Sequence, residues 1–332
     1  TLTGGTHNFT VNQRPVGVSG TRLYDATTNA VASDLSTHAN LVGSETLTLS
    51  GTGTIASKDV GPNKTVSVGT LALGNGSNGG LAANYTLSGG THQLTVNQRP
   101  LNATLARQYD GTTVAAGSTL SSFDALQGGE TLTMTGSGTA ASANVANGIA
   151  MSSNGNLALA DGTGAASNYS LNSTVINVTQ RPINLSGTKI YDGNTTLNNS
   201  IVSVSSGLIG IETLTLTGEV NTNNANVGSY STSGGTLNVG STTINIANGS
   251  NGGLAANYAI NDGNFTITQR PVGVSGTRLY DATTNAVASD LSTHANLVGS
   301  ETLTLSGTGT IASKDVGSNK TVSVGTLALG NG

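Results

Sequence analysis

The sequence of 332 residues contains no cysteine and no tryptophan, and it has only 12 basic residues, 8 tyrosines and 3 phenylalanines. Without cysteine there are no disulfides and few structural zinc sites, so each domain must be stabilised by packing, by another metal or by its neighbours. No apolar run approaches the ~20 residues that a membrane-spanning helix needs. The net charge of −4 offers no basic surface for nucleic acid or for an anionic membrane. We therefore expect no nucleic-acid partner and no membrane span.

Glycine, threonine, serine and asparagine take the place of the missing residues. Glycine accounts for 47 positions, and charged residues make up only 8 % of the chain. Such a composition has few helix formers and favours short strands joined by many turns. Disordered chains usually combine low hydrophobicity with high net charge and few β-branched residues, a combination that this sequence does not show. The composition therefore predicts a folded, mostly β protein.

An Arg-Pro pair occurs four times and opens a repeat of about 85 residues. The pairs are Arg14-Pro15, Arg99-Pro100, Arg181-Pro182 and Arg270-Pro271. Residues 13–76 reappear as 269–332 with one difference, Pro62 against Ser318. We expect residues 1–13 to be the closing strand of a preceding repeat, followed by repeats at 14–98, 99–180 and 181–269 and a truncated one at 270–332. The sequence then reads as a window of a longer chain. A continuous β-helix would need a repeat of about twenty residues, which is not found.

The first repeat alternates apolar and polar residues with the period of two that strands require. The apolar positions are Val16 and Val18, Leu47 and Leu49, Val66 and Val68, and Leu94 and Val96. This alternation predicts an antiparallel or mixed sheet with one wetted side. Asp34 to Val42 carries a helix-start residue and is followed by Gly43, which predicts one short helix against the apolar side. The expected fold is a tandem array of small β-rich domains, β-grasp-like with one short helix, joined end to end.

Three further signatures recur in the repeats. They are the Tyr-Asp pairs Tyr24-Asp25, Tyr109-Asp110, Tyr191-Asp192 and Tyr280-Asp281; the glutamates of Glu-Thr-Leu-Thr at Glu45, Glu130, Glu212 and Glu301; and the pairs Asn84-Tyr85, Asn168-Tyr169 and Asn257-Tyr258. We interpret the tyrosines as core residues whose hydroxyls reach a partner at the rim, with a sugar-stacking surface as the alternative. The aspartate is placed to accept a hydrogen bond from the backbone two residues later and to fix a turn.

The Gln-Arg-Pro junctions leave no room for a flexible linker. Leu94 to Asn97 ends one repeat and Leu101 begins the next, with three residues between. Because proline fixes its own φ and biases the preceding residue toward extended conformations, adjacent repeats should be joined stiffly. The arginine is either a solvated charge or a partner of the recurring glutamate.

Together these motifs resemble the YDG-type repeat. The resemblance rests on Tyr-Asp-Gly-Thr-Thr at Tyr109, on Lys-Asp-Val-Gly-x-x-Lys-Thr-Val at Lys58, and on Asn84-Tyr-Thr-Leu followed by a strand into Arg-Pro. Ala26 departs from the pattern, because it stands where a glycine is expected. Such repeats occur in very large bacterial surface and secreted proteins of the filamentous-haemagglutinin and two-partner-secretion kind. The resemblance implies an extracellular location, at the bacterial surface or secreted, and the role of an adhesin or filament stalk in adhesion or biofilm. It carries over no catalytic residues.

No constellation of residues suggests an enzyme, a cofactor or a metal. The four histidines, His7, His38, His92 and His294, are not clustered, and we interpret them as solvent or loop residues. No glycine-rich phosphate loop or nucleophile elbow appears, and calcium at repeat junctions is left open. The main hypothesis is a structural stalk or fibre, which contacts other copies of itself, or a host or matrix surface through regions outside this window. The alternatives are a multivalent glycan- or self-binding module and a head-to-tail filament built by strand donation between chains.

Overall fold

A computed structural model describes residues 3–232 and 243–332 of the chain. The described residues form strands, turns and single-turn 3₁₀-helices, and they contain no α-helix, so the prediction of a mostly β array is confirmed. The chain divides into two compact units, residues 1–179 and 180–332. Each unit holds two repeats, and every strand pairs within its own repeat.

The first repeat is built around two parallel strands, its first long strand β2 and its last strand β10. Its sheet has the order β3-β6-β7-β10-β2-β4, in which β7 and β4 flank the central pair in antiparallel fashion. First and last strands lying parallel at the centre of a mixed sheet are the arrangement of a β-grasp sheet. The elements are β1 Arg14–Pro15, β2 Gly17–Leu23, β3 Asn29–Val31, η1 Ala32–Asp34, β4 Thr37–Ala39, β5 Leu47–Ser50, β6 Thr52–Ile55, β7 Gly61–Ser67, β8 Ala72–Asn75, η2 Ala82–Asn84, β9 Tyr85–Thr86 and β10 His92–Asn97.

The core follows from the alternation of apolar side chains along β10. His92, Leu94 and Val96 point inward and are buried, whereas the residues between them are partly exposed. Leu94 and Val96 pack with Val18 and Tyr24 in one apolar cluster. Strands β5 and β8 form a separate antiparallel pair, and their partly buried Leu49 and Leu73 pack against the same cluster.

The short helix predicted over residues 34–42 is wrong. Residues 32–34 form one 3₁₀ turn, and Thr37–Ala39 then forms strand β4, paired antiparallel with β2. An isolated segment of nine residues gains little from helix formation, whereas the free edge of β2 offers it backbone partners along a sheet. The antiparallel pair β5–β8 packs instead against the apolar cluster that the helix was expected to cover.

The second repeat has the same strand order, β12-β15-β16-β18-β11-β13. Its first and last strands, β11 and β18, are longer and pair in parallel over ten residues. The elements are β11 Arg99–Gln108, β12 Val114–Ala116, η3 Gly117–Thr119, β13 Leu120–Phe123, β14 Leu132–Thr135, β15 Ser137–Ala140, β16 Ala146–Ser153, β17 Ala158–Asp161, η4 Ala166–Asn168 and β18 Tyr169–Thr179.

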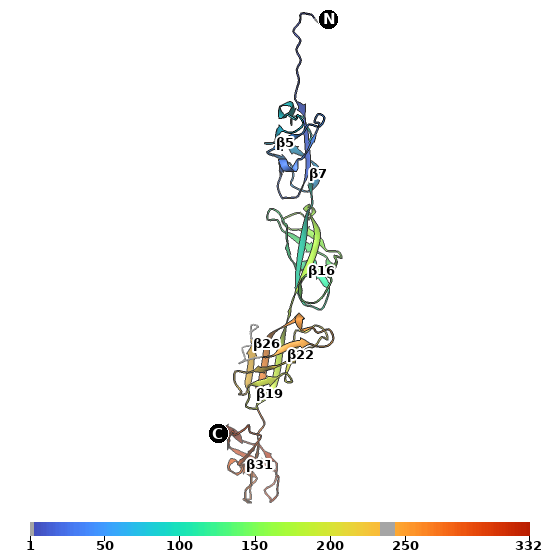
Figure 1. Cartoon of the computed structure of the whole chain (residues 1–332). Coiled ribbons are helices and arrows are strands. Elements are labelled where there is room, and N and C mark those ends of the chain that lie inside the picture. Colours follow the sequence, from blue (N-terminus) through green and yellow to red (C-terminus); the bar gives the residue numbers. More distant parts are fainter. Residues whose placement is uncertain (1–2, 233–242) are drawn as a thin grey trace. The chain divides into compact units, whose positions relative to one another are not determined.

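The third repeat again pairs its first and last strands, β19 and β26, in parallel over ten residues (Figure 1). Phe265 of β26 is 1 % exposed and lies in a cluster with Leu185, Leu197 and Val220. The elements are β19 Arg181–Ile190, β20 Thr196–Asn198, β21 Val202–Ser206, β22 Leu214–Thr217, β23 Glu219–Asn221, β24 Gly228–Thr232, β25 Asn245–Asn248, η5 Ala255–Asn257 and β26 Tyr258–Thr268.

Residues 270–332 repeat the local elements of the first repeat but with a shorter central region. Strand β27 has three residues where β2 has seven, and β32 has two where β7 has seven. The elements are β27 Gly273–Ser275, β28 Asn285–Val287, η6 Ala288–Asp290, β29 Thr293–Ala295, β30 Leu303–Ser306, β31 Thr308–Ile311, β32 Val322–Ser323 and β33 Ala328–Asn331.

Candidate functional site

The aspartate of each Tyr-Asp pair fixes a tight turn, as predicted. Its Oδ1 accepts a hydrogen bond from the backbone N–H two residues later, at 2.9 to 3.0 Å. The residue after the aspartate has a positive φ, 75° at Gly111 and 76° at Gly193. Ala26 and Ala282 keep the same turn with φ of 62° and 65°. The turn is therefore retained where alanine replaces glycine, in a conformation that alanine adopts only with strain.

A basic residue three positions before this aspartate was missed by the sequence analysis. Arg22, Arg107, Lys189 and Arg278 each form an ion pair with the aspartate of their own Tyr-Asp pair. The same side chains also donate to backbone carbonyls of the turn, as Arg22 does to Thr27 O at 2.6 Å. The signal was visible, since a cation precedes all four aspartates at this spacing.

Most signature tyrosines are buried. Tyr24, Tyr85, Tyr109, Tyr169 and Tyr258 are at most 3 % exposed, whereas Tyr280 is 57 % exposed and Tyr191 is half-buried. The interpretation of the tyrosines as core residues is confirmed for these five.

Within a repeat, the tyrosine of the Asn-Tyr pair donates to the glutamate of Glu-Thr-Leu-Thr. Tyr85 bonds to Glu45, Tyr169 to Glu130 Oε2 at 2.8 Å, and Tyr258 to Glu212 Oε2 at 2.5 Å. Each tyrosine hydroxyl also accepts a backbone N–H at 3.1 Å. The glutamate and tyrosine are about 40 residues apart, so the bond ties two distant segments of one repeat together.

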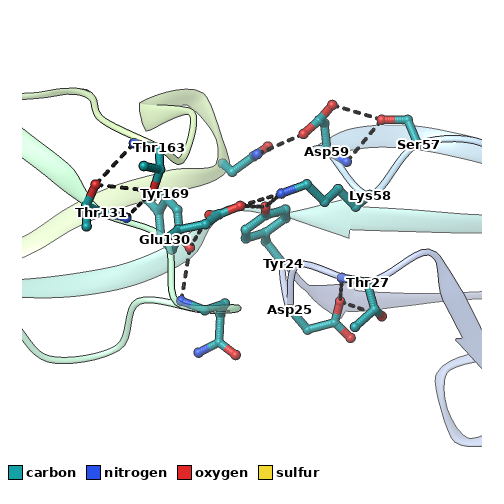
Figure 2. Close-up of polar contacts among 12 residues, drawn as sticks. Tyr24, Asp25, Thr27, Ser57, Lys58, Asp59, Glu130, Thr131, Thr163 and Tyr169 are labelled. Carbon is teal, nitrogen blue, oxygen red and sulfur yellow. Dashed lines mark hydrogen bonds and ion pairs between the residues drawn. The ribbon is translucent and has the colours of Figure 1, made fainter.

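Between the first two repeats, one glutamate serves both sides of the junction (Figure 2). Glu130 of the second repeat accepts from its own Tyr169 through Oε2, and its Oε1 accepts from Tyr24 of the first repeat at 2.6 Å. Lys58 of the first repeat forms an ion pair with the same Oε1 and donates to Tyr24 Oη at 2.6 Å. The rings of Tyr24 and Tyr169 meet edge to face at 5.3 Å between centroids. We call Tyr24, Lys58, Glu130 and Tyr169 the joint cluster.

A second polar contact lies beside the joint cluster. Asn168, which is 1 % exposed, donates from Nδ2 to Asp59 Oδ1 at 2.9 Å and accepts the Val60 N–H at 2.9 Å through Oδ1. Because both the Nδ2 and the Oδ1 atom of this buried amide are hydrogen-bonded, moving the two repeats apart would leave buried polar groups without partners, which costs free energy. The apolar core is also continuous here, since Leu101, Leu132 and Tyr169 belong to the cluster that holds Val18 and Tyr24.

The joint cluster shifts the pKa values of its members. Burial, with the neighbouring Glu130 carboxylate, raises the pKa of Tyr169 to about 12. Burial and the same carboxylate also raise the pKa of Tyr24. Burial opposes ionisation of Glu130, but the hydrogen bonds from Lys58, Tyr24 and Tyr169 outweigh it and hold its pKa below the usual value. Near neutral pH the cluster therefore contains one carboxylate, one ammonium and two neutral phenols.

The arginines of the Arg-Pro pairs bind backbone carbonyls. Arg99 Nε donates to Tyr24 O of the preceding repeat at 2.6 Å, and Arg14, Arg181 and Arg270 donate to carbonyls of Asn40, Gly207 and Asn296 within their own repeats. Of the two alternatives left open for these arginines, a solvated charge or a partner of the recurring glutamate, the second is not observed, because they bind backbone carbonyls and the glutamates accept from tyrosines. The preceding glutamine adds another bond, from Gln98 Nε2 to Ser167 O at 3.1 Å.

The junction between the third and fourth repeats uses the same tyrosine–glutamate link. Tyr191 of the third repeat donates its hydroxyl to Glu301 of the fourth, and Arg270 Nη1 donates to Tyr191 O at 3.4 Å. The burial and the aromatic partner that Tyr24 has at the first junction are not reproduced, since Tyr191 is only half-buried. A glutamate that accepts from the tyrosine of the preceding repeat is thus present in both compact units.

The interpretation of the histidines as solvent or loop residues is wrong for His92. This side chain is 7 % exposed, its Nδ1 accepts the Val18 N–H at 3.3 Å, and its Nε2–H donates to Leu87 O at 2.8 Å. His92, which lies on β10, thus hydrogen-bonds to the backbone of β2. His38 is half-buried, and burial lowers its pKa, whereas His7 is exposed.

No group of three or more His, Asp or Glu side chains in residues 3–232 and 243–332 is arranged to hold a metal ion. In the same part of the chain, no helix has the length and apolar character of a membrane span.

Comparison with known proteins agrees with the repeat signatures. The family model for the YDG domain matches residues 8–95, 92–176 and 265–332. A search of curated proteins gives no significant match. The matched segments exceed half of the chain and contain the joint cluster and both copies of the duplicated segment. The chain therefore belongs to the YDG domain family.

Proposed function

We propose that this chain is a structural repeat region, a stalk or fibre segment, of an extracellular bacterial adhesin of the filamentous-haemagglutinin and two-partner-secretion kind. Its role is to give length and stiffness for adhesion or biofilm formation, and the protein is not an enzyme. The observation that carries the proposal is the joint cluster. The first two repeats share a buried carboxylate, a tyrosine pair and a continuous apolar core, and only Gln98 lies between the last strand of one and the first strand of the next.

The physical argument is that a shared core resists bending. A junction held by one flexible linker lets domains reorient, whereas this one would have to expose Tyr24, which is 0 % exposed, and separate Glu130 from Lys58. Hydrogen bonds to a charged group contribute about 1.5–3 kcal/mol each. Repeats coupled in this way gain stability from their neighbours.

The alternative of a multivalent glycan-binding module required exposed tyrosines repeated along one face. Five signature tyrosines are buried and bonded to glutamates or packed in a core, so the feature on which that alternative depended is missing for them.

Spin labels test the stiffness directly, since the chain has no native cysteine to interfere. Thr48→Cys and Thr133→Cys place labels at corresponding exposed positions of the first two repeats. Double electron–electron resonance should give a narrow distribution of distances between the two labels, and Glu130→Ala should broaden this distribution. As a matched control, Glu45→Ala removes the corresponding glutamate of the first repeat and should leave the width unchanged. A broad distribution in the unmodified chain would overturn the structural role, and immunogold labelling of the native cells with an antibody against this chain tests the location.

A further inference from the structure

The residue that follows the Tyr-Asp pair differs among the repeats. It is alanine in the first and fourth repeats, at Ala26 and Ala282, and glycine in the second and third, at Gly111 and Gly193. Ala26 packs partly buried against the apolar cluster that the first two repeats share. In the first repeat this residue therefore contributes to the packing between repeats as well as to its own turn.

At the first junction, Ala26 faces a loop of the second repeat. A β-carbon added at Gly128 of this loop would lie only 2.9 Å from the Ala26 methyl carbon, so the methyl group lies directly over the glycine. The side chain of the neighbouring Gln127 is directed to its own loop, where Nε2 donates to Ala125 O at 2.9 Å. The side chain that fills this contact is therefore supplied by the first repeat.

At the junction between the third and fourth repeats, the same contact is filled from the other side. Gly193 of the third repeat has no side chain, and Val298 of the fourth repeat faces it. Val298 corresponds to Gln127, since the carbonyl of each accepts the backbone N–H of the recurring glutamate three residues later, at 3.1 and 2.9 Å. A β-carbon added at Gly193 would lie 3.0 Å from Val298 Cγ1, well inside the ~3.5–4.0 Å at which carbon atoms attract each other.

The polar contacts and the backbone do not distinguish the two junctions in this respect. A tyrosine of one repeat donates to a glutamate of the next at both, from Tyr24 at the first junction and from Tyr191 at the other. The turn after the tyrosine also has the same left-handed backbone, with φ of 62° at Ala26 and 76° at Gly193. Because the two backbones are alike, the size of the side chain at this position decides which partner fits.

We propose that this pair of positions selects which repeat can dock after which. A repeat with alanine after its Tyr-Asp pair fits a repeat with glutamine at the position of Gln127, and a repeat with glycine fits one with valine there. Alanine against valine overpacks the contact, whereas glycine against glutamine leaves a gap. Repeats of similar sequence in one chain are prone to pair wrongly during folding, and a mismatch that costs free energy favours docking of each repeat with its own neighbour.

Spin labels on the full chain test the matching at the junction between the third and fourth repeats. Thr215→Cys and Thr304→Cys are exposed positions that carry the labels, and a broad component of their distance distribution reports undocked junctions. Gly193→Ala should raise the undocked fraction roughly tenfold, because it overpacks the contact. Adding Val298→Gln should restore the narrow distribution, although the strain of alanine in the turn remains. No effect of Gly193→Ala, or the same effect with and without Val298→Gln, would overturn the proposal.

The converse exchange at the first junction is the matched control, with labels at Thr48→Cys and Thr133→Cys. Gln127→Val should raise the undocked fraction, and adding Ala26→Gly should reverse the increase. The same rescue should appear in the midpoint of chemical denaturation, which reads the match without labels. Failure of Ala26→Gly to rescue Gln127→Val in both measurements would contradict the matching. The inference does not rest on the stalk function, because it is read from the difference between single and double variants and not from the stiffness of the unmodified chain.

Discussion

Residues 13–76 and 269–332 compare one sequence in two settings. In the first, the strand β10 and the second repeat are present, and Tyr24 is 0 % exposed. In the second, no described residue occupies either place, and the corresponding Tyr280 is 57 % exposed. Only Pro62 and Ser318 differ between the two segments. The difference in structure must therefore come from contacts outside the segment.

The comparison separates local from distant causes. The antiparallel pair β5–β8 and its copy β30–β33 pair over the same four residues, and η1 and η6 keep the same 3₁₀ turn. By contrast, β2 and β7 keep their full length only in the first repeat. The elements that both copies keep pair within residues 13–76 or 269–332, whereas β2 and β7 pair with β10, which lies outside that segment.

The largest effect is expected from Leu94→Ala, which truncates the central buried side chain of β10. Truncating a buried leucine costs about 3 kcal/mol because transfer energy and packing are both lost. Hydrogen exchange should quicken in β2 and β7, which then resemble β27 and β32, while β5 and β8 keep their protection. Phe9→Ala changes the corresponding but exposed position and should alter the unfolding of dilute protein by less than about 0.5 kcal/mol. Unchanged protection in β2 and β7 would mean that β10 does not order them.

Alkaline pH should weaken the joint cluster, which is the other contact that distinguishes the two settings. A tyrosine in the unfolded chain ionises near pH 10, whereas the pKa of Tyr169 is about 12. The folded state holds this proton more tightly, so the stabilisation is complete below pH 10 and is lost as the pH rises to 12, by about 2 kcal/mol. Denaturation measured at pH 9 to 12 checks this, and Tyr169→Phe should remove this part of the loss. For Glu130, whose pKa is lowered, the contribution is present above about pH 4.5 and disappears as the pH falls.

A smaller effect is expected from a matched pair of substitutions, Tyr24→Phe and Tyr280→Phe. The first removes a buried hydroxyl 2.6 Å from the Glu130 carboxylate and should cost about 1.5 kcal/mol. The second removes an exposed hydroxyl and should change the free energy of unfolding by less than about 0.5 kcal/mol. Chemical denaturation, followed by exchange in residues 14–98 and 269–332, measures both. Equal costs would show that the glutamate contact does not distinguish the two tyrosines.

The smallest effect is expected from a substitution at the one position where the two segments differ in sequence. Pro62→Ser makes the first segment identical to the last, and should lower its stability by about 0.5 kcal/mol by freeing the unfolded chain. Tyr24 should stay buried, which quenching or chemical modification of tyrosine can measure. An opening of β2 and β7 in this variant would instead assign the whole difference between the copies to Pro62.

The sequence predicted well what depends on near neighbours. The period of two located the strands around Leu47, Val66 and Leu94, and the aspartate turn at Asp25 has the expected backbone bond. The helix at residues 34–42 failed because a sheet edge, set by strands elsewhere, competes for that segment. A cation three residues before Asp25 was visible and missed.

The joint cluster could not be predicted from the sequence. Tyr24 and Glu130 are 106 residues apart and belong to different repeats. A repeated glutamate and a repeated tyrosine give no indication of whether the bond forms within one repeat or across two. Glu130 accepts hydrogen bonds from tyrosines of both repeats, and only the packing of the two repeats shows this.

The parallel first and last strands of each repeat also determine how it bears tension. A pull on the chain acts at the start of β11 and at the end of β18, so the two strands are drawn past each other in shear. All their pairings then carry the load together, ten residue pairs here and ten between β19 and β26, against six between β2 and β10. A hairpin pulled at its open end would instead unzip one bond at a time. Each complete repeat therefore works as a mechanical clamp, and the second and third repeats should withstand more force than the first.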